Sequence, residues 1–238
     1  MASSLKAIVR INQEVVDCRL CPRLVAWREE AALNPPARFR GEEYWARPLP
    51  GFGDHNARLL IVGLAPAAHG GNRTGRIFTG DRSGDWLFRA LHKAGFANQP
   101  TSEHIGDGLG LEDCYIAAVV RCAPPANKPL PTERDTCIQY LVREMDAMQN
   151  LQVVVALGSF AWDGILRALR LSGRAVPAPK PRFGHLAKVG AGNLTLIGSY
   201  HPSQQNTFTG TLTQQAFDQV FAGAKAMLTK TSKRKEER

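Results

Sequence analysis

The chain carries the segment RLLIVGLAPAAHGGNRTGRIFTGD at residues 58–81. Its first part, residues 58–63, is a short apolar run that ends in glycine, which is typical of a parallel strand buried on both faces. The part from Gly63 to Asp81 is rich in glycine and leads into residues 83–95, where apolar residues recur at helical spacing. A buried strand, a glycine-rich turn and a helix in this order indicate an α/β fold.

The same alternation continues along the chain and indicates a parallel sheet covered by helices on both faces. Residues 34–57 show no clear period and are expected to form a long loop, and the proline-rich stretch 172–192 is expected to form another, with a short edge strand. Further buried strands are predicted at 114–121, 153–158 and 194–198, and further helices at 5–17, 22–32, 132–149, 159–171 and 212–228.

Four loops follow the carboxyl ends of the predicted strands, at 63–81, 122–131, 158–159 and 199–211. They are polar or rich in glycine. Open α/β sheets bind their ligands at this edge. The sequence therefore predicts a binding cleft where the four loops meet.

Length and composition fit one domain with a substantial core. The chain has 238 residues, 44% of them hydrophobic, and no composition shift marks a boundary, so residues 1–229 are predicted as a single domain. Residues 230–238 are predicted to be a disordered basic tail, which supplies only part of the formal net charge of +9. A basic body favours a polyanionic partner, most simply nucleic acid.

Four cysteines have the residue type and number of a metal centre. Cys18 and Cys21 form a tight C-x-x-C, and Cys122 and Cys137 lie about a hundred residues downstream. Four thiolates suit tetrahedral zinc or an iron–sulfur cluster, and the presence of only one close pair favours the cluster. Buried free thiols with a chance C-x-x-C are the structural alternative. Cys114 lies in an apolar run and is expected to be a core residue.

The odd number of cysteines argues against a disulfide framework. The chain shows no secretory segment and no apolar run of membrane-spanning length. We therefore expect a cytoplasmic, nucleoid-associated protein without a membrane partner, and a monomer.

Three residues at the predicted cleft each have a functional and a structural interpretation. Asp81 stands just before a helix, so it is a candidate active-site carboxylate or a helix N-cap. His201 follows the last strand beside Pro202 and is either presented to the cleft or bonded to the backbone. Phe78 is a candidate wall of the cleft or a core residue.

The motifs together resemble one family. GLAPAAHGGNRTGR at 63–76, His-Pro-Ser at 201–203 and the four-cysteine layout resemble the iron–sulfur uracil-DNA glycosylases, specifically the type B (family 5) branch. The resemblance covers about residues 15–228. It implies a three-layer αβα sandwich around a mainly parallel four-stranded sheet, with an N-terminal helical segment tied down by a structural 4Fe–4S cluster. It also implies hydrolytic removal of uracil from DNA, leaving an abasic site.

The resemblance assigns roles residue by residue. It implies that Asp81 acts on the water and His201 on the leaving base. The cluster ligands it implies are Cys18, Cys21, Cys122 and Cys137, and the base-binding residues are Gly63, Ala65, Ala68, Phe78 and Asn127.

One position departs from the wider superfamily. Other branches carry a polar or acidic side chain where this chain has Ala65, so Asp81 is left as the carboxylate for the water. A pocket built from alanines also suggests that other deaminated bases, such as hypoxanthine or xanthine, enter it, as in type B relatives.

Contacts to the DNA backbone are expected from the rim of the cleft. A glycosylase must extrude its target base, and basic or polar side chains that hold phosphates would offset that cost. The candidates are Arg73, Arg76, Ser203, Gln204 and Gln205.

Two alternatives from other classes stay open at the sequence level. A non-catalytic DNA-binding or damage-sensing module would share the scaffold and the metal centre, but would not need Asp81, Asn127, Phe78 and His201 together. A nucleotide-metabolism enzyme acting on small substrates fits less well, because the chain is basic and lacks the glycine-lysine motif of a P-loop.

Overall fold

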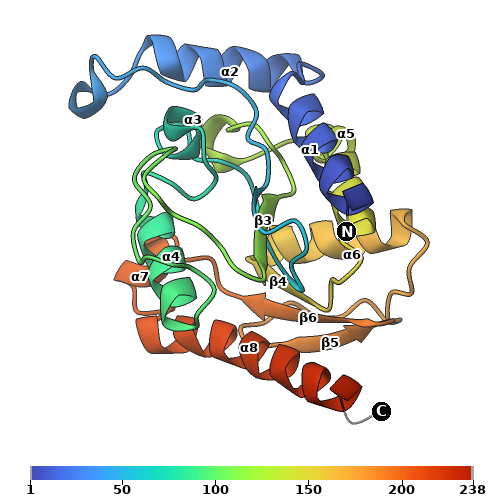
Figure 1. Cartoon of the computed structure of the whole chain (residues 1–238). Coiled ribbons are helices and arrows are strands. Elements are labelled where there is room, and N and C mark those ends of the chain that lie inside the picture. Colours follow the sequence, from blue (N-terminus) through green and yellow to red (C-terminus); the bar gives the residue numbers. More distant parts are fainter. Residues whose placement is uncertain (1, 237–238) are drawn as a thin grey trace.

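A mixed sheet of six strands forms the centre of the molecule in the computed structural model, which describes residues 2–236 (Figure 1). The strand order is β1-β3-β2-β4-β6-β5. The strands are β1 (Phe52–Gly53), β2 (Leu59–Gly63), β3 (Cys114–Ala118), β4 (Val153–Leu157), β5 (Lys188–Ala191) and β6 (Leu194–Ser199).

Strands β3, β2, β4 and β6 pair in parallel, and β1 and β5 join the two edges antiparallel. The parallel strands are the four that the apolar runs predicted. The expectation of a four-stranded sheet is wrong in number. The two edge strands carry little sequence signal because β1 has two residues and β5 exposes Lys188 and Gly190. β5 is the edge strand expected within 172–192.

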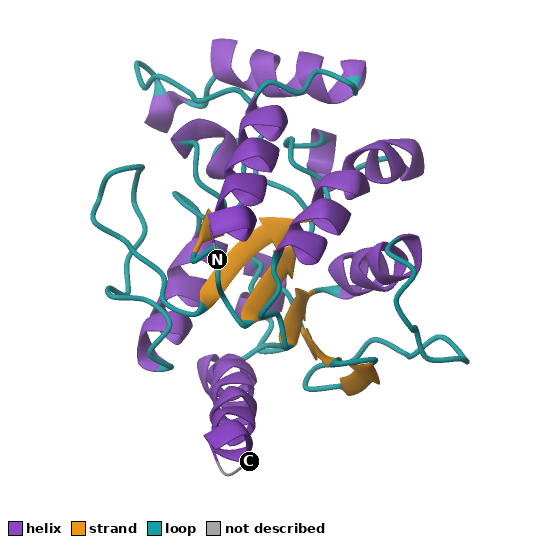
Figure 2. Cartoon of the chain, turned by 45° about the vertical axis from the view of Figure 1, so that its right-hand side comes forward, coloured by secondary structure: helices purple, strands orange, loops and turns teal. Residues whose placement is uncertain are grey.

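Helices cover both faces of the sheet, as predicted. The helices are α1 (Ala2–Val16), α2 (Pro22–Leu33), α3 (Gly71–Thr74), α4 (Arg82–Lys93), α5 (Pro131–Ala147), α6 (Ser159–Leu171), α7 (Gln204–Phe208) and α8 (Gln214–Glu236). Side chains alternate along β2, so that Leu60 and Val62 pack with α1, α5 and α6, whereas Leu59 and Ile61 pack with α4 and α8. The fold is therefore a three-layer arrangement, with the twisted sheet between two helical layers (Figure 2).

The two shortest helices, α3 and α7, were not predicted, because four or five residues are too few to show a helical period. The last helix, α8, continues to Glu236, through most of the segment 230–238 that was expected to be disordered. Residues 237–238 lie outside the described residues. Between residues 2 and 236, no helix combines the length and apolar character needed to cross a membrane.

Candidate active site

A cavity of about 460 Å³ opens at the carboxyl edge of the sheet, where the loops after β2, β3 and β6 meet. This volume lies in the usual range of small-ligand pockets, roughly 300–1,000 Å³. It is lined by Leu64, Ala65, Pro66, Ala67, Ile77, Phe78, Asp81, Arg82, Ser83, Asn127, His201, Ser203, Gln204 and Gln205. The predicted cleft is therefore present. The fourth loop, at Gly158, lines a smaller hollow that shares only His201 and Leu64 with this cavity.

Asp81 is both a helix N-cap and a cavity residue. Its Oδ1 accepts a hydrogen bond from the backbone N–H of Gly84 at 3.1 Å, at the start of α4. Its other oxygen lies so close to Gly70 that a Cβ there would stand 2.3 Å from Oδ2, so only glycine leaves room for the carboxylate. Burial raises the pKa of Asp81 above the ordinary value of 3.8, against the lowering effect of the N-cap hydrogen bonds. The two interpretations of Asp81 are thus compatible.

His201 presents a neutral imidazole to the cavity. Its side chain has no hydrogen-bond partner among residues 2–236, while its carbonyl accepts from Nδ2 of Asn206 at 2.8 Å. Burial lowers the pKa of His201 from 6.5 to about 4. At neutral pH the ring therefore keeps one N–H that it can donate to a bound molecule.

The depressed pKa of His201 predicts a pH dependence of stability. The folded protein takes up this proton less readily than the unfolded chain, so the free energy of unfolding is fully retained above pH 6.5 and falls as the pH drops toward 4. Thermal unfolding of the unsubstituted protein and of His201→Asn across this range checks the prediction. The variant should lose less stability between the two pH values, and equal losses would contradict the burial effect.

Phe78 forms a flat wall of the cavity beside His201. The two ring centroids lie 6.0 Å apart with an interplanar angle of 30°. Phe78 also packs in the core on the α4 and α8 side, so the functional and structural interpretations again both hold. Gly63 makes room for the ring, because a Cβ there would stand 2.7 Å from Cζ of Phe78. Gly63 acts behind the wall and does not itself line the cavity.

Asn127 stands at the open side of the cavity, in the short helical turn Pro125–Asn127. Ala126 and Asn127 both have positive φ, of 52° and 55°. Asparagine tolerates this left-handed conformation better than most residues. The exposed amide offers one acceptor and two donor hydrogens to a ligand.

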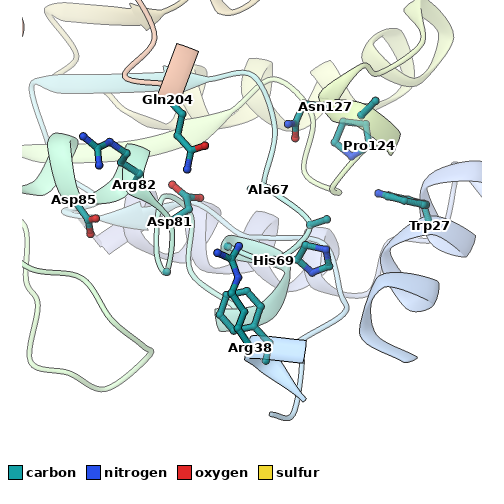
Figure 3. A pocket seen from close by; sticks show the side chains of 15 residues that line it. Trp27, Arg38, Ala67, His69, Asp81, Arg82, Asp85, Pro124, Asn127 and Gln204 are labelled. Carbon is teal, nitrogen blue, oxygen red and sulfur yellow. The ribbon is translucent and has the colours of Figure 1, made fainter. Parts of the chain in front are cut away.

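A second hollow of about 550 Å³ adjoins the cavity and shares Ala67, Asp81, Arg82, Asn127 and Gln204 with it. Figure 3 shows Asp81 and Gln204 pointing toward one another, with Asn127, Trp27 and His69 around the hollow. Ala68 lines this second hollow, whereas Ala65 lines the cavity itself.

Arg73 and Arg76 were expected to hold DNA phosphates, and in this structure both guanidiniums bond within the protein. Arg76 is buried, and its guanidinium donates to Asp107 at 2.9 Å and to Ser102 at 2.8 Å. Against the effect of burial, the hydrogen bond from Arg76 holds the pKa of Asp107 well below its usual range. Arg73 donates to Glu42 at 2.6 Å and to the carbonyl of His69 at 2.9 Å. Both arginines brace the loop from within.

Arg82 and Arg38 are the guanidiniums at the two hollows, and neither was predicted. Arg82 is exposed at the start of α4 and lies over the ring of Phe208, with its Cζ 4.4 Å from the centroid. Because Arg82 directly follows Asp81 in the sequence, its position at the cleft could have been predicted. Arg38 carried none, because it lies in the aperiodic loop 34–57, whereas His69 stood within the motif at 63–76.

The loop after β6 places its polar residues along the cavity. Ser203 caps α7, and its Oγ accepts from the backbone N–H of Asn206 at 3.4 Å. Gln204 and Gln205 are exposed in the first turn of α7 and line the cavity.

The four predicted metal ligands surround one small hollow behind the active-site loops. Cys18 and Cys21 come from the turn between α1 and α2, Cys122 from the loop after β3, and Cys137 from α5. The hollow measures about 10 Å³, and no group of three or more possible ligands in residues 2–236 is arranged to hold a metal ion.

Cys122 and Cys137 are buried, whereas Cys18 and Cys21 are half-buried. Burial raises the pKa of Cys122 to about 11 and that of Cys137 to about 12. Both thiols therefore keep their protons unless a bound metal cation displaces the protons. Cys114 is fully buried in β3, as expected of a core residue.

Comparison with known proteins agrees with this architecture. Residues 50–225 match the uracil DNA glycosylase superfamily. A type-5 uracil-DNA glycosylase of Mycobacterium bovis is 50% identical over 95% of this chain and 84% of its own length, and one of Thermus thermophilus is 49% identical over 90% and 95%. A type-4 uracil-DNA glycosylase of Archaeoglobus fulgidus is 31% identical over 65% of this chain and 70% of its own. The chain therefore belongs to the uracil DNA glycosylase superfamily, with the type-5 uracil-DNA glycosylases as its relatives along nearly its whole length.

Proposed function

We propose that this protein extrudes uracil from DNA and hydrolyses its N-glycosidic bond, leaving an abasic site. The carrying observation is that Asp81, His201, Phe78 and Asn127 line one cavity of about 460 Å³ at the carboxyl edge of the sheet. Base excision uses an aromatic ring to stack on the base, an amide to recognise its edge, a neutral hydrogen-bond donor and a carboxylate. Binding alone would not need all four.

The extruded base would lie against Phe78 and face Asn127. Extrusion costs a few kcal/mol and is easiest where pairing is already poor, as in a U·G mismatch. The flat ring of Phe78 matches a base face, and the Asn127 amide can pair with O4 and N3–H of uracil.

During cleavage of the glycosidic bond, His201 would act on the departing base and Asp81 on the sugar. The C1′–N1 bond breaks with its electron pair going to uracil, so negative charge grows on O2 and positive charge on the sugar. The neutral imidazole of His201 stabilises the first, and the carboxylate of Asp81 the second. Water then bonds to C1′, and Asp81 orients it or takes its proton.

The test is release of uracil from a U·G duplex, measured as free base and as alkali-labile sites at the uracil position. A matched T·G duplex is the control. Binding of both duplexes without any release would favour the non-catalytic damage-sensing module instead.

A wider substrate range is part of the proposal. Ala65 and Ala67 leave the cavity wall without bulky side chains, which suits a purine such as hypoxanthine or xanthine. The same assay with hypoxanthine opposite thymine tests this extension. Release of uracil alone would limit the protein to uracil.

Contacts to the DNA backbone are proposed for Arg82, Ser203, Gln204 and Gln205, which lie exposed or half-buried along the cavity. We expect Arg82→Ala to weaken DNA binding and to reduce the slope of log K against log salt by about one. Binding titrations at several salt concentrations measure this slope. Arg89→Ala changes another exposed arginine of the same helix, one that lines neither hollow, and should leave the slope unchanged.

A structural 4Fe–4S cluster is proposed for the four cysteines. Four thiols facing one hollow, with the buried cations Arg28 and Arg121 beside them, fit an anionic thiolate-ligated centre, although the side chains would have to draw apart to admit it. When bound, such a cluster would fasten the N-terminal helices to the loop that carries Asn127. A broad absorption near roughly 400 nm in fresh protein would support it. A cytoplasmic, monomeric protein remains a prediction from the sequence.

We expect Cys122→Ala to lower the folding yield first and activity as a consequence. The substitution removes one of four ligands and leaves Arg28 without its sulfur partner. Soluble yield, iron content and uracil release per folded molecule are measured, with Cys114→Ala as the control cysteine outside the set. A well-folded, iron-free Cys122→Ala protein with full activity would contradict the structural role.

A further inference from the structure

Arg28 is a buried cation without a carboxylate partner. It lies on α2, is 2% exposed, and makes no salt bridge among residues 2–236. Nη1 donates to Sγ of Cys122 at 3.0 Å, and both Nη atoms donate more weakly to the carbonyl of Cys18, at 3.4 Å. Nε has no partner among residues 2–236. The other arginine at this hollow, Arg121, pairs with Glu144. A buried charge is costly unless it is paired, so Arg28 calls for negative charge on the cysteine side.

The backbone of Arg28 is joined to the active-site loop through Asn72. Nδ2 of Asn72 donates to the carbonyl of Arg28 at 3.1 Å and to the carbonyl of Ala68 at 3.3 Å. The backbone N–H of Asn72 also donates to the carbonyl of Ala67 at 3.1 Å. Asn72 is 1% exposed, so no water competes for its amide hydrogens. One side chain thus ties α2 to the turn 67–72.

That turn forms part of the active site. Ala67 lines both hollows, and Ala68 and Gly70 line the second one together with Asp81. The close approach of Gly70 to the Asp81 carboxylate means that a shift of the turn changes the space around that oxygen.

We infer that Arg28 and Asn72 form a positioning link, by which a charged centre at the four cysteines fixes the turn 67–72 beside Asp81. The effect of this link on catalysis rests on the proposed function, whereas the contacts that form the link do not. The cysteine thiolates would bind the guanidinium of Arg28. The backbone carbonyl of Arg28 accepts a hydrogen bond from the side-chain amide of Asn72, and the same amide donates to the carbonyl of Ala68. When the centre is removed, Arg28 loses this partner and the turn loosens.

The link is tested by backbone hydrogen exchange of the peptide covering residues 66–72, with the protein as purified and after iron chelation. We expect chelation to speed exchange there in the unsubstituted protein. In Asn72→Ala, exchange should already be fast and should respond little to chelation, while iron content stays normal. Residues of β4 serve as the internal reference, because their unchanged protection shows that the fold persists.

Arg28 variants separate charge from packing. Partners of metal ligands typically contribute about 10–100-fold to metal affinity. We therefore expect Arg28→Met to lose iron to a chelator about tenfold faster or more, and Arg28→Lys, which keeps the charge, to lie between. Arg174→Met removes a half-buried guanidinium outside the link, one that bonds to Asp146, and should match the unsubstituted protein in both readouts.

Two outcomes would overturn the inference. One is exchange at 66–72 that ignores chelation in the unsubstituted protein. The other is an Asn72→Ala protein whose turn still responds fully to chelation. Both readouts are independent of uracil release, so absence of glycosylase activity would refute the proposed function and leave the link standing.

Discussion

Replacing Asp81 by Asn is expected to slow uracil release about 100- to 10,000-fold under single-turnover conditions, the usual contribution of a positioned acid or base. Asparagine has nearly the same shape and is itself a good N-cap, so the hydrogen bond to Gly84 and the start of α4 should survive. The variant loses the negative charge and the proton acceptor. DNA binding, measured separately, should stay within a few fold.

The pH profile distinguishes a carboxylate role from a packing role. Burial raises the pKa of Asp81, so the active, ionised form is lost at a pH above the ordinary carboxyl value of 3.8 as the solution is acidified. The unsubstituted protein should show this acidic decline and Asp81→Asn should lack it. Asp85→Asn, which neutralises an exposed carboxylate beside the second hollow, is the matched control and should keep the decline. The decline should move only toward lower pH, because the Asp85 charge adds to the raised pKa of Asp81. Unchanged excision by Asp81→Asn would remove this residue from the active site.

Glu144→Leu is expected to be the most destabilising of the substitutions considered, at about 3–5 kcal/mol of unfolding free energy. Glu144 is 0% and Arg121 1% exposed, and they form an ion pair beneath the cysteine hollow. Removing the carboxylate leaves the Arg121 cation buried without a hydrogen-bond partner among residues 2–236, because Nε and Nη1 have none and Nη2 bonds to Glu144. It also removes one of the two partners of the Tyr115 hydroxyl, which keeps its bond to Asn12. Denaturant unfolding measures the loss.

The double variant Arg121→Met, Glu144→Leu shows whether the loss comes from the stranded charge. Replacing both members of a buried pair by apolar residues is often neutral, so the double variant should recover much of the lost stability. A double variant as unstable as Glu144→Leu would show that packing, not charge, sets the cost.

The buried strands and long helices were predictable because hydrophobic period is a local signal. The runs at 59–63 and 153–157 are apolar on both faces and could only be buried. Asp81 and His201 were predictable as neighbours because the carboxyl ends of parallel strands share one edge.

The contacts of Arg73 and Arg76 could not be predicted, because both arginines bond to residues that are distant in sequence. Arg76 looks like a free surface charge until Asp107 is seen to fold against it, and Arg73 until Glu42 does. Sequence spacing carries no information about such pairs. The same holds for Arg28, whose missing carboxylate is visible only once α2 is packed.

The position of the Asn127 amide depends on two successive residues with a left-handed backbone conformation, Ala126 and Asn127. A non-glycine residue held there costs about 1–2 kcal/mol, and this strain is accepted when the chain folds, before any nucleotide arrives. Association with a substrate then requires no ordering of this backbone, so little conformational entropy is lost on contact. The free protein already holds Ala126 and Asn127 in this backbone conformation.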